Sequence, residues 1–422
     1  MEAYKIKRSI ICIDLKSFFA SVECALRGLD PFKTPLIVAD KGRGGGSIVL
    51  AVTPFLKARG MPSRCRLHEV EQTAGLIIAS PRMREYVKMS ARITEIYLRF
   101  VAEEDLHIYS IDEAFLDLTN YLTYYQKDVR SIARMILETI LKETKVPATC
   151  GIGDNLLLAK LALDLYSKKA SDGMAHIHYD DVAEKLWPVK PLSDMWGIGR
   201  RMEIRLNRLN IFSVYDLAHA NKKHLKKLFG VIGEELYYHA HGIDLSVISE
   251  KNSVYTPMKS VGLGQTLFKD YDAEMIMQIF LEMSDEVAER LRFIRKHAKT
   301  IHLGIGYSKA IGGGFSRQLS WDVSSDDPDA ILQAVMFLFH KHGEAYPIRS
   351  VFIRATNLTP AVSIFQSSFF EDAHKKAQRK ALWETIDAVR IRFGKKSVAR
   401  LSSYLASGTM LERSTLVGGH HG

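Results

Sequence analysis

The chain has 422 residues and carries 58 Lys and Arg against 48 Asp and Glu, which gives a formal net charge of +10 at pH 7. This length exceeds what one hydrophobic core ordinarily supports, so several domains are expected. The positive charge favours a polyanionic partner, although a ribosomal or membrane surface would fit it equally well. The four cysteines form no CxxC pair and therefore indicate neither a zinc site nor a disulfide framework.

The scattered cysteines predict a reducing cytoplasm, and the N-terminal segment predicts a soluble, intracellular protein without a membrane partner. Its apolar run ends at Asp14, which makes it too short for a signal peptide or a membrane span. Residues 9–14 are expected to form a strand. A helix is expected to follow over 17–23, with Ser17 available as its cap.

A small inserted lobe is expected next. Short strands at 36–39 and 48–52 lie on either side of the glycine-rich loop 41–46, and the segment 54–60 reads as a helix. The lobe is bounded by a longer helical pattern over 81–102.

Two adjacent acids, Asp112 and Glu113, stand inside the apolar stretch 109–117, between strands predicted at 106–111 and 115–118. Lone charges are costly in a core element, and a bound metal would explain them. If Asp14 lies on a neighbouring strand, three carboxylates converge where two Mg²⁺ ions about 3.5–4 Å apart could bind. The alternative is that these acids merely end their strands, and the motif alone does not decide between the two.

The remaining N-terminal half completes an α+β arrangement. A helix is expected over 126–144 and another strand over 148–153, so a sheet backed by two helices would carry the acids on its exposed face.

Beyond Pro188 short helices alternate with glycines. Two turns open helices with free backbone N–H groups that suit a phosphate, and lysines and arginines lie beside both. This pattern favours a helix-hairpin-helix module that grips a DNA backbone over the reading of simple helix caps with a solvated charged face. The candidate residues are Gly197, Gly199, Arg200, Arg201, Gly230 and Gly233.

A second fold is expected after the polar segment 243–259, which suits a linker. Strand patterns at 261–268, 299–307, 315–321 and 349–357 alternate with helix patterns at 273–297 and 327–343, in β-α-β-β-α-β order. The tail 361–422 contains a predicted helix over 373–394.

These motifs together resemble the Y-family translesion DNA polymerases, and within them the bacterial UmuC-like branch. The resemblance rests on segments 14–23 and 109–113, supported by 150–155 and 158–162. It implies a right-hand polymerase of α+β multidomain architecture, with palm, small fingers, helical thumb and little finger. The implied ranges are 1–17 and 77–171 for the palm, 18–76 for the fingers, 172–242 for the thumb, 243–259 for the linker and 260–360 for the little finger.

The resemblance also implies roles for single residues. Asp14, Asp112 and Glu113 would be the catalytic residues and hold two Mg²⁺ ions, with the backbone carbonyl of Leu15 as a further ligand. Phe19 would be the steric gate that excludes a ribose 2′-OH by a clash, with Phe18 packed beside it. The alternative is that both rings are core aromatics at the start of a helix.

The triphosphate contacts depart from the family pattern. Many relatives place a Tyr and an Arg where this chain has Pro54 and Lys57, so the tyrosine contact is in doubt. Lys57 would supply a point charge without the bidentate fork of an arginine, and Arg59 is a weaker substitute on a different helix face. Lys160 matches the second triphosphate lysine, its alternative being a helix lysine that extends to solvent.

Residues 366–371 resemble the peptide by which bacterial polymerases bind the sliding clamp. Gln366, Phe369 and Phe370 would dock on the clamp, since two aromatics in an exposed tail are costly unless they bind somewhere. The alternative is that they pack on the chain's own surface.

The implied function is template-directed, low-fidelity DNA synthesis past damaged bases in DNA repair and the SOS response. The implied partners are primer-template DNA, deoxynucleoside triphosphates and the clamp, while RecA or accessory subunits are left open. The rivals are a noncatalytic DNA-binding protein and a metal nuclease or cyclase on a similar palm. The intact acids argue against the first, and the hairpins with Phe19 argue against the second.

Overall fold

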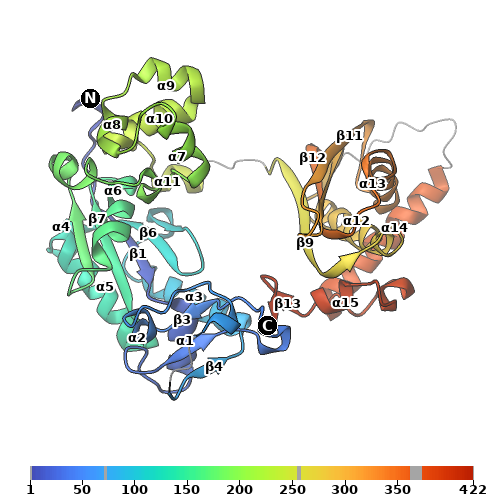
Figure 1. Ribbon diagram of the computed structural model, residues 1–422, viewed down its shortest axis with the longest axis horizontal. Coiled ribbons are helices and arrows are strands. Elements are labelled where there is room, and N and C mark those ends of the chain that lie inside the picture. Colours follow the sequence, from blue (N-terminus) through green and yellow to red (C-terminus); the bar gives the residue numbers. More distant parts are fainter. Residues whose placement is uncertain (1, 71–73, 254–257, 362–372, 422) are drawn as a thin grey trace. The chain divides into compact units, whose positions relative to one another are not determined.

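The computed structural model describes residues 2–70, 74–253, 258–361 and 373–421. The chain divides into two compact units, one formed by residues 1–255 with 420–422 and the other by residues 256–419 (Figure 1). Among the described helices, none is both long enough and apolar enough to cross a membrane.

The first unit is built on a five-stranded sheet of order β5-β6-β1-β7-β8, antiparallel except for the parallel pair β7–β8. Its central strand β1 is fully apolar from Ile10 to Ile13, and each of these residues is buried. The strands predicted near residues 10 and 148 are confirmed. The bounds are β1 (Ile10–Leu15), β5 (Leu106–Ile108), β6 (Glu113–Asp117), β7 (Ala148–Gly153) and β8 (Met174–Ile177).

Helices pack on this sheet and against one another. α5 lies on β7 and contacts α3, while α6 lies on β1 and β7 (Figure 1). Both long predicted helices exist but are shorter at their N-terminal or C-terminal ends than their apolar spacing indicates. The bounds are α3 (Met83–Tyr97), α4 (Tyr121–Tyr125), α5 (Val129–Thr144) and α6 (Leu156–Leu161).

The inserted lobe carries a three-stranded sheet of order β3-β2-β4, in which β2 pairs antiparallel with β3 and parallel with β4. The strand predicted over 48–52 is regular only at its last two residues. The helix expected over 54–60 ends early, at Lys57, and Gly60 three residues later has a positive φ of 87°. The bounds are α1 (Phe18–Leu26), β2 (Leu36–Val38), β3 (Ala51–Val52), α2 (Pro54–Lys57) and β4 (Ile77–Ala79).

Two local expectations of this region are corrected. Ser17 does not cap α1 with its side chain; its backbone is instead left-handed, with φ 50°. Asp112 is not inside a core strand: it lies half-buried in the turn that joins β5 to β6, where the N–H groups of Tyr109 and Ser110 both donate to the carbonyl of Glu113. A turn leaves a carboxylate free to reach solvent or a ligand, which a strand core does not.

Small helices with one shared apolar core follow β8. Leu206, Leu217, Leu225 and Leu236 are among the buried residues of this core. The helix-forming segments open where the glycine turns were predicted, at Arg200 and Val231. The bounds are α7 (Arg200–Asn207), α8 (Val214–Ala218), α9 (Lys222–Phe229), α10 (Val231–Ala240) and α11 (Ile248–Ser253).

The first part of the predicted linker is ordered structure. Ile243 and Ile248 are buried, and α11 packs beside β5 of the main sheet. The guanidinium of Arg8 also donates to the carbonyl of Ser246 at 2.7 Å. Residues 243–253 therefore belong to the first unit, because a few apolar side chains anchor a segment that is otherwise polar.

The second unit confirms the β-α-β-β-α-β order. Its antiparallel sheet has the order β11-β10-β12-β9, and both helices pack on it. Alternate residues of β10, from Ile301 to Tyr307, are buried, as expected for a strand with one face on the core. The bounds are β9 (Ser260–Tyr271), α12 (Met275–Phe293), β10 (Lys296–Tyr307), β11 (Gly314–Ser325), α13 (Pro328–His342) and β12 (Ile348–Pro360).

The described part of the predicted tail from residue 373 to 419 belongs to the second unit. Arg292 of α12 makes two hydrogen bonds, of 2.6 and 3.0 Å, to Asp387 of α14, and Arg400 makes two to Asp285 of α12. The clamp-like residues Gln366, Phe369 and Phe370 lie outside the described residues. The bounds are α14 (Ala373–Phe393), α15 (Met410–Arg413), β13 (Leu416–Val417) and β14 (His420–His421).

Candidate active site

The antiparallel register of β1 and β6 sets Asp14 directly opposite Glu113. The backbone N–H of Leu15 donates to the carbonyl of Asp112 at 2.9 Å, so the turn that carries Asp112 is tied to the end of β1. Asp14 lies about 100 residues before Asp112 and Glu113 in the sequence, yet all three acids are carried by one end of two adjacent strands. The pairing of two buried apolar strands positions all three.

Two lysines from the segment after β7 neutralise this cluster. Lys160 Nζ lies 2.6 Å from Glu113 Oε1, and Lys168 Nζ lies 3.2 Å from Asp14 Oδ2. Asp164 bridges them, with its oxygens 3.0 Å from Lys160 Nζ and 3.1 Å from Lys168 Nζ. The result is an alternating network of carboxylates and ammonium groups along one wall of the site.

The electrostatics of the cluster favour a cation. Burial raises the pKa of Asp14; the neighbouring charge of Lys168 opposes this, while those of Asp112 and Glu113 add to it. For Lys160 burial acts to lower the pKa, but the hydrogen bond to Glu113 and the charge of Asp164 raise it well above its usual range. Carboxylates that repel one another in a partly buried place gain from a bound cation.

The donor set fits hard divalent cations. Asp14, Asp112 and Glu113 offer only oxygen atoms, the ligand type that Mg²⁺ prefers. Ser110 Oγ donates to Asp112 Oδ1 at 2.8 Å and orients that side chain. Within the described residues, these three carboxylates are not a group whose ligand atoms all lie within 4.8 Å of one another. Lys160 contacts Glu113 and Lys168 contacts Asp14 in this structure.

The two aromatic rings after Asp14 have different environments. Phe18 is 3% exposed and is a core residue, which favours the alternative reading for this ring. Phe19 is partly exposed and stacks on Tyr86, with ring centroids 4.6 Å apart and planes inclined by 18°. Tyr86 is itself fully buried, and its hydroxyl donates to Glu23 Oε1 at 2.8 Å. One face of the Phe19 ring therefore packs on the buried Tyr86, while part of the ring remains exposed.

The candidate triphosphate residues on and just after α2 differ in their surroundings. Desolvation lowers the pKa of Lys57, against the attraction of the Asp14 carboxylate, so Lys57 is within electrostatic reach of the acids. Arg59 instead lies over the ring of Phe55, 3.6 Å from its centroid. Pro54 begins α2 and offers neither a hydroxyl nor an N–H. Of these residues, Lys57 alone couples to the acidic cluster.

The two predicted glycine turns of the helical region both contain a glycine with positive φ. Gly197 has φ 92° and Gly230 has φ 67°, conformations that favour glycine, and Arg200 and Arg201 are exposed at the start of α7. Gly199 is the exposed residue just before α7.

Gly233 has a packing role instead of a phosphate contact. It is buried, and an added Cβ would lie 2.2 Å from the carbonyl oxygen of Leu225, so it permits the close approach of α9 and α10. Its N–H already donates to Gly230. This corrects the expectation that Gly233 would present its backbone to DNA.

Comparison with known proteins agrees with this geometry. Models of the impB/mucB/samB family match residues 13–164, the family's HHH motif matches 179–211 and its C-terminal domain matches 258–369. The chain is 41% identical to "Putative UV-damage repair protein UvrX" of Bacillus subtilis, over 98% of each chain. The solved structure of "Y-family DNA polymerase chimera Dbh-Dpo4(243-245)-Dbh" superposes with a TM-score of 0.65 over 83% of this chain and 99% of that one, at 23% identity.

This chain belongs to the Y family of DNA polymerases. It is also 32% identical to "DNA polymerase IV 2" of Bacillus subtilis, over 98% of this chain and 99% of the relative. The α+β multidomain architecture and the polymerase class expected from the sequence are confirmed. Polymerases of this family generally use divalent metal ions, and their substrates are DNA and nucleotides.

Sequence reasoning missed several neighbours of the site in this Y-family polymerase. Asp164 and Lys168 follow Lys160 at helical spacing, four and eight residues on, which is the signal that would have placed them on one face. Tyr86 carries no such signal, because its contact with Phe19 depends on how α1 packs on α3.

Proposed function

We propose that this chain extends a DNA primer by template-directed addition of deoxynucleotides, including addition opposite damaged template bases, in DNA repair. The observation that supports the proposal is the register of β1 with β6, which sets Asp14 opposite Glu113 with Asp112 in the adjoining turn.

The carboxylates would bind the catalytic metal ions. Asp14, Asp112 and Glu113 are the proposed ligands, with the backbone carbonyl of Leu15 as a further one, and their all-oxygen chemistry suits two Mg²⁺ ions. When bound, such ions activate the primer 3′-OH and stabilise the leaving pyrophosphate. The protein's own task is to hold these oxygens at the end of a rigid sheet.

The lysines of the network would bind the triphosphate. Lys160 and Lys168 now neutralise Glu113 and Asp14, and a metal ion on those acids would free both ammonium groups for phosphate oxygens. Lys57 lies within reach of the same acids and would contribute a third positive charge. Three ammonium groups would thereby compensate for the missing tyrosine and arginine contacts on α2.

Selection of the sugar and grip on the duplex would come from other elements. Phe19, backed by Tyr86, would fill the space of a ribose 2′-OH. The exposed starts of α7 and α10, with Gly197, Gly199, Gly230, Arg200 and Arg201, would contact DNA phosphates without reading sequence.

Primer extension across a lesion tests the proposed function. The purified chain is given a primer-template with one abasic site, all four deoxynucleotides and Mg²⁺. We expect extension on undamaged template and a measurable fraction of product beyond the abasic site. Complete absence of extension on undamaged template would refute the polymerase proposal, whereas arrest only at the abasic site would refute lesion bypass alone.

The clamp contact is a separate proposal, supported by the sequence of residues 366–371. If Phe369 and Phe370 dock on a bacterial sliding clamp, replacing both by Ala should remove clamp stimulation of synthesis and leave clamp-free synthesis unchanged. The reason is that the peptide would act only by raising the local concentration of polymerase at the primer end. RecA and accessory subunits are left as partners to be tested.

A matched control for the clamp experiment uses two other aromatics of the second unit. Phe393 is 66% exposed and Tyr404 is 64% exposed, and replacing both by Ala should preserve clamp stimulation. Stimulation that survives in the Phe369→Ala, Phe370→Ala variant would show that this motif serves the chain's own packing.

A further inference from the structure

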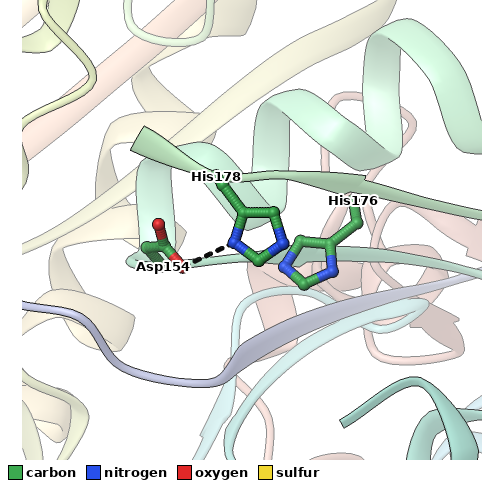
Figure 2. Close-up of side chains that lie close together, drawn as sticks. All are labelled: Asp154, His176 and His178. Atoms are coloured by element: carbon green, nitrogen blue, oxygen red, sulfur yellow. Dashed lines mark hydrogen bonds and ion pairs between the residues drawn. The ribbon is translucent and has the colours of Figure 1, made fainter. Parts of the chain in front are cut away.

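A cluster of one acid and two histidines lies away from the proposed catalytic residues. Asp154 follows β7 directly, and His176 and His178 lie in and just after β8 (Figure 2). One nitrogen or oxygen from each of the three side chains lies within 4.8 Å of the other two. Within the described part of the chain, this is the only group of acids, histidines and cysteines that meets so closely.

The parallel register of β7 and β8 creates the cluster. Ile152 pairs with His176 and Gly153 with Ile177, so continuing the register by one residue brings Asp154 beside His178. Residues 176 and 178 are two apart on an extended backbone and face the same side, while Ile177 is fully buried on the other. The two imidazole rings lie next to each other in Figure 2, and their centroids are 3.7 Å apart.

The carboxylate of Asp154 is already oriented. It is buried, and Oδ2 accepts the backbone N–H of Tyr179 at 2.8 Å. Oδ1 lies 3.1 Å from Nδ1 of His178. The backbone carbonyl of Asp154 accepts the N–H of Arg8 at 3.0 Å. One oxygen of this carboxylate is therefore held by the backbone and the other faces an imidazole. Hydrogen bonds of this kind orient the ligands of protein metal sites.

A positive charge beside the cluster is already paired with an acid. The nearest ammonium group, Lys185, is held 3.0 Å from Asp181 and donates to the carbonyl of His176 at 3.1 Å. Its charge is therefore partly compensated within the same loop.

We infer that Asp154, His176 and His178 form a binding site for a transition-metal dication of the Zn²⁺ type. Two imidazoles and one carboxylate are borderline ligands that suit Zn²⁺, Co²⁺ or Ni²⁺ and suit Mg²⁺ poorly. Tetrahedral coordination with bonds of about 2.0–2.1 Å sets ligand atoms roughly 3.3 Å apart, so small side-chain rotations from the present spacing would close the site. A water molecule would complete the shell.

A bound ion would cross-link β7 to the segment that leads into the helical region. Asp154 and His178 are 24 residues apart in the sequence, and the pairing of the edge strand β8 with β7 brings them together. An ion that binds the folded chain and not the unfolded one stabilises the fold by mass action. The site would therefore be structural, and its chemistry differs from that of the all-oxygen site proposed at Asp14.

The test measures Zn²⁺ binding by calorimetry in the presence of excess Mg²⁺, which occupies oxygen-only sites. We expect one equivalent to bind to the wild-type chain and at least tenfold weaker binding in the His176→Gln, His178→Gln variant. Co²⁺ substituted at the site should give visible ligand-field absorption that is lost in the same variant. The melting temperature should rise with one equivalent of Zn²⁺ in the wild type alone.

Matched controls separate this site from other histidines. His340 and His342 repeat the His-x-His spacing on helix α13. A second pair of histidines, His420 and His421, are consecutive in the sequence. Replacing either pair by Gln should leave the binding intact. The milder Asp154→Asn variant keeps an acceptor for Tyr179, guards against misfolding and should also weaken binding. No Zn²⁺ binding by the wild type, or equal binding by the His176→Gln, His178→Gln variant, would overturn the inference.

Discussion

Replacing Asp14 or Asp112 by Asn is expected to abolish primer extension while leaving the fold and DNA binding intact. A neutral amide is a poor ligand for Mg²⁺. Losing several kcal/mol of transition-state stabilisation lowers the rate of primer extension by about 10³-fold or more. The measurement is single-nucleotide insertion on a primer-template, with DNA binding followed separately by anisotropy.

Stability should separate this effect from misfolding. Burial raises the pKa of Asp14 in the folded chain, so its ionisation at neutral pH works against folding, and stability from this group is gained as the pH falls through the raised pKa. Removing the charge with Asp14→Asn should therefore leave the melting temperature at pH 7 unchanged or higher.

Asp117, on strand β6, provides the matched control for both acids. It pairs with Ile10 at the opposite end of β6, and its carboxylate accepts the N–H of Thr119. Asp117→Asn should retain extension within a few-fold of the wild type. Near-normal extension by Asp14→Asn or Asp112→Asn would remove these residues from the catalytic site.

Replacing Phe19 by Ala is expected to admit ribonucleotides. The ring stacks on Tyr86, which is held by its hydrogen bond to Glu23, so it has no room to retreat from a 2′-OH. Relieving a clash of 1–3 kcal/mol corresponds to an increase of about 10- to 100-fold in the ratio of ribonucleotide to deoxynucleotide insertion. Steady-state insertion of a matched ribonucleotide and deoxynucleotide pair gives this ratio.

Phe18 supplies the control for the gate. It is buried in the core, and Phe18→Leu keeps most of its volume, so stability should fall modestly and sugar selection should not change. An unchanged ratio in Phe19→Ala, together with a raised ratio in Phe18→Leu, would transfer the gate to Phe18.

Local pattern was enough to predict most elements. The period-2 alternation of β10 and the helical spacing of α12 and α13 lie within single segments, so the β-α-β-β-α-β order could be predicted without knowledge of distant contacts. The strand β1 could be predicted from its apolar run for the same reason. The strands predicted at 106–111 and 115–118 left Asp112 between them, but the apolar residues Ile111 and Ala114 concealed that the chain reverses there.

Polar segments misled the prediction where their partners are remote in sequence. The tail after residue 373 lacks a strong apolar face of its own, yet it is bound to α12 by charge pairs such as Arg400 with Asp285 and Arg413 with Glu286. Each pair joins residues more than 100 positions apart. Ion pairs leave no periodic signature, so the sequence predicted the helix over 373–394, present as α14, but not the contact of the tail with α12. The segment 243–253 was predicted to be a linker because only a few apolar residues, such as Ile243 and Ile248, anchor it.

By itself the sequence determined the family, the order of elements and the three acids, because apolar periodicity and short motifs are local properties of the chain. Tertiary structure alone decided which groups surround those acids. Lys168 meets Asp14, Tyr86 backs Phe19, and Asp154 meets His176 and His178, each through the pairing or packing of separate elements. The sequence specifies which chemical groups are present, but the distances between groups that are remote in sequence are set only by folding.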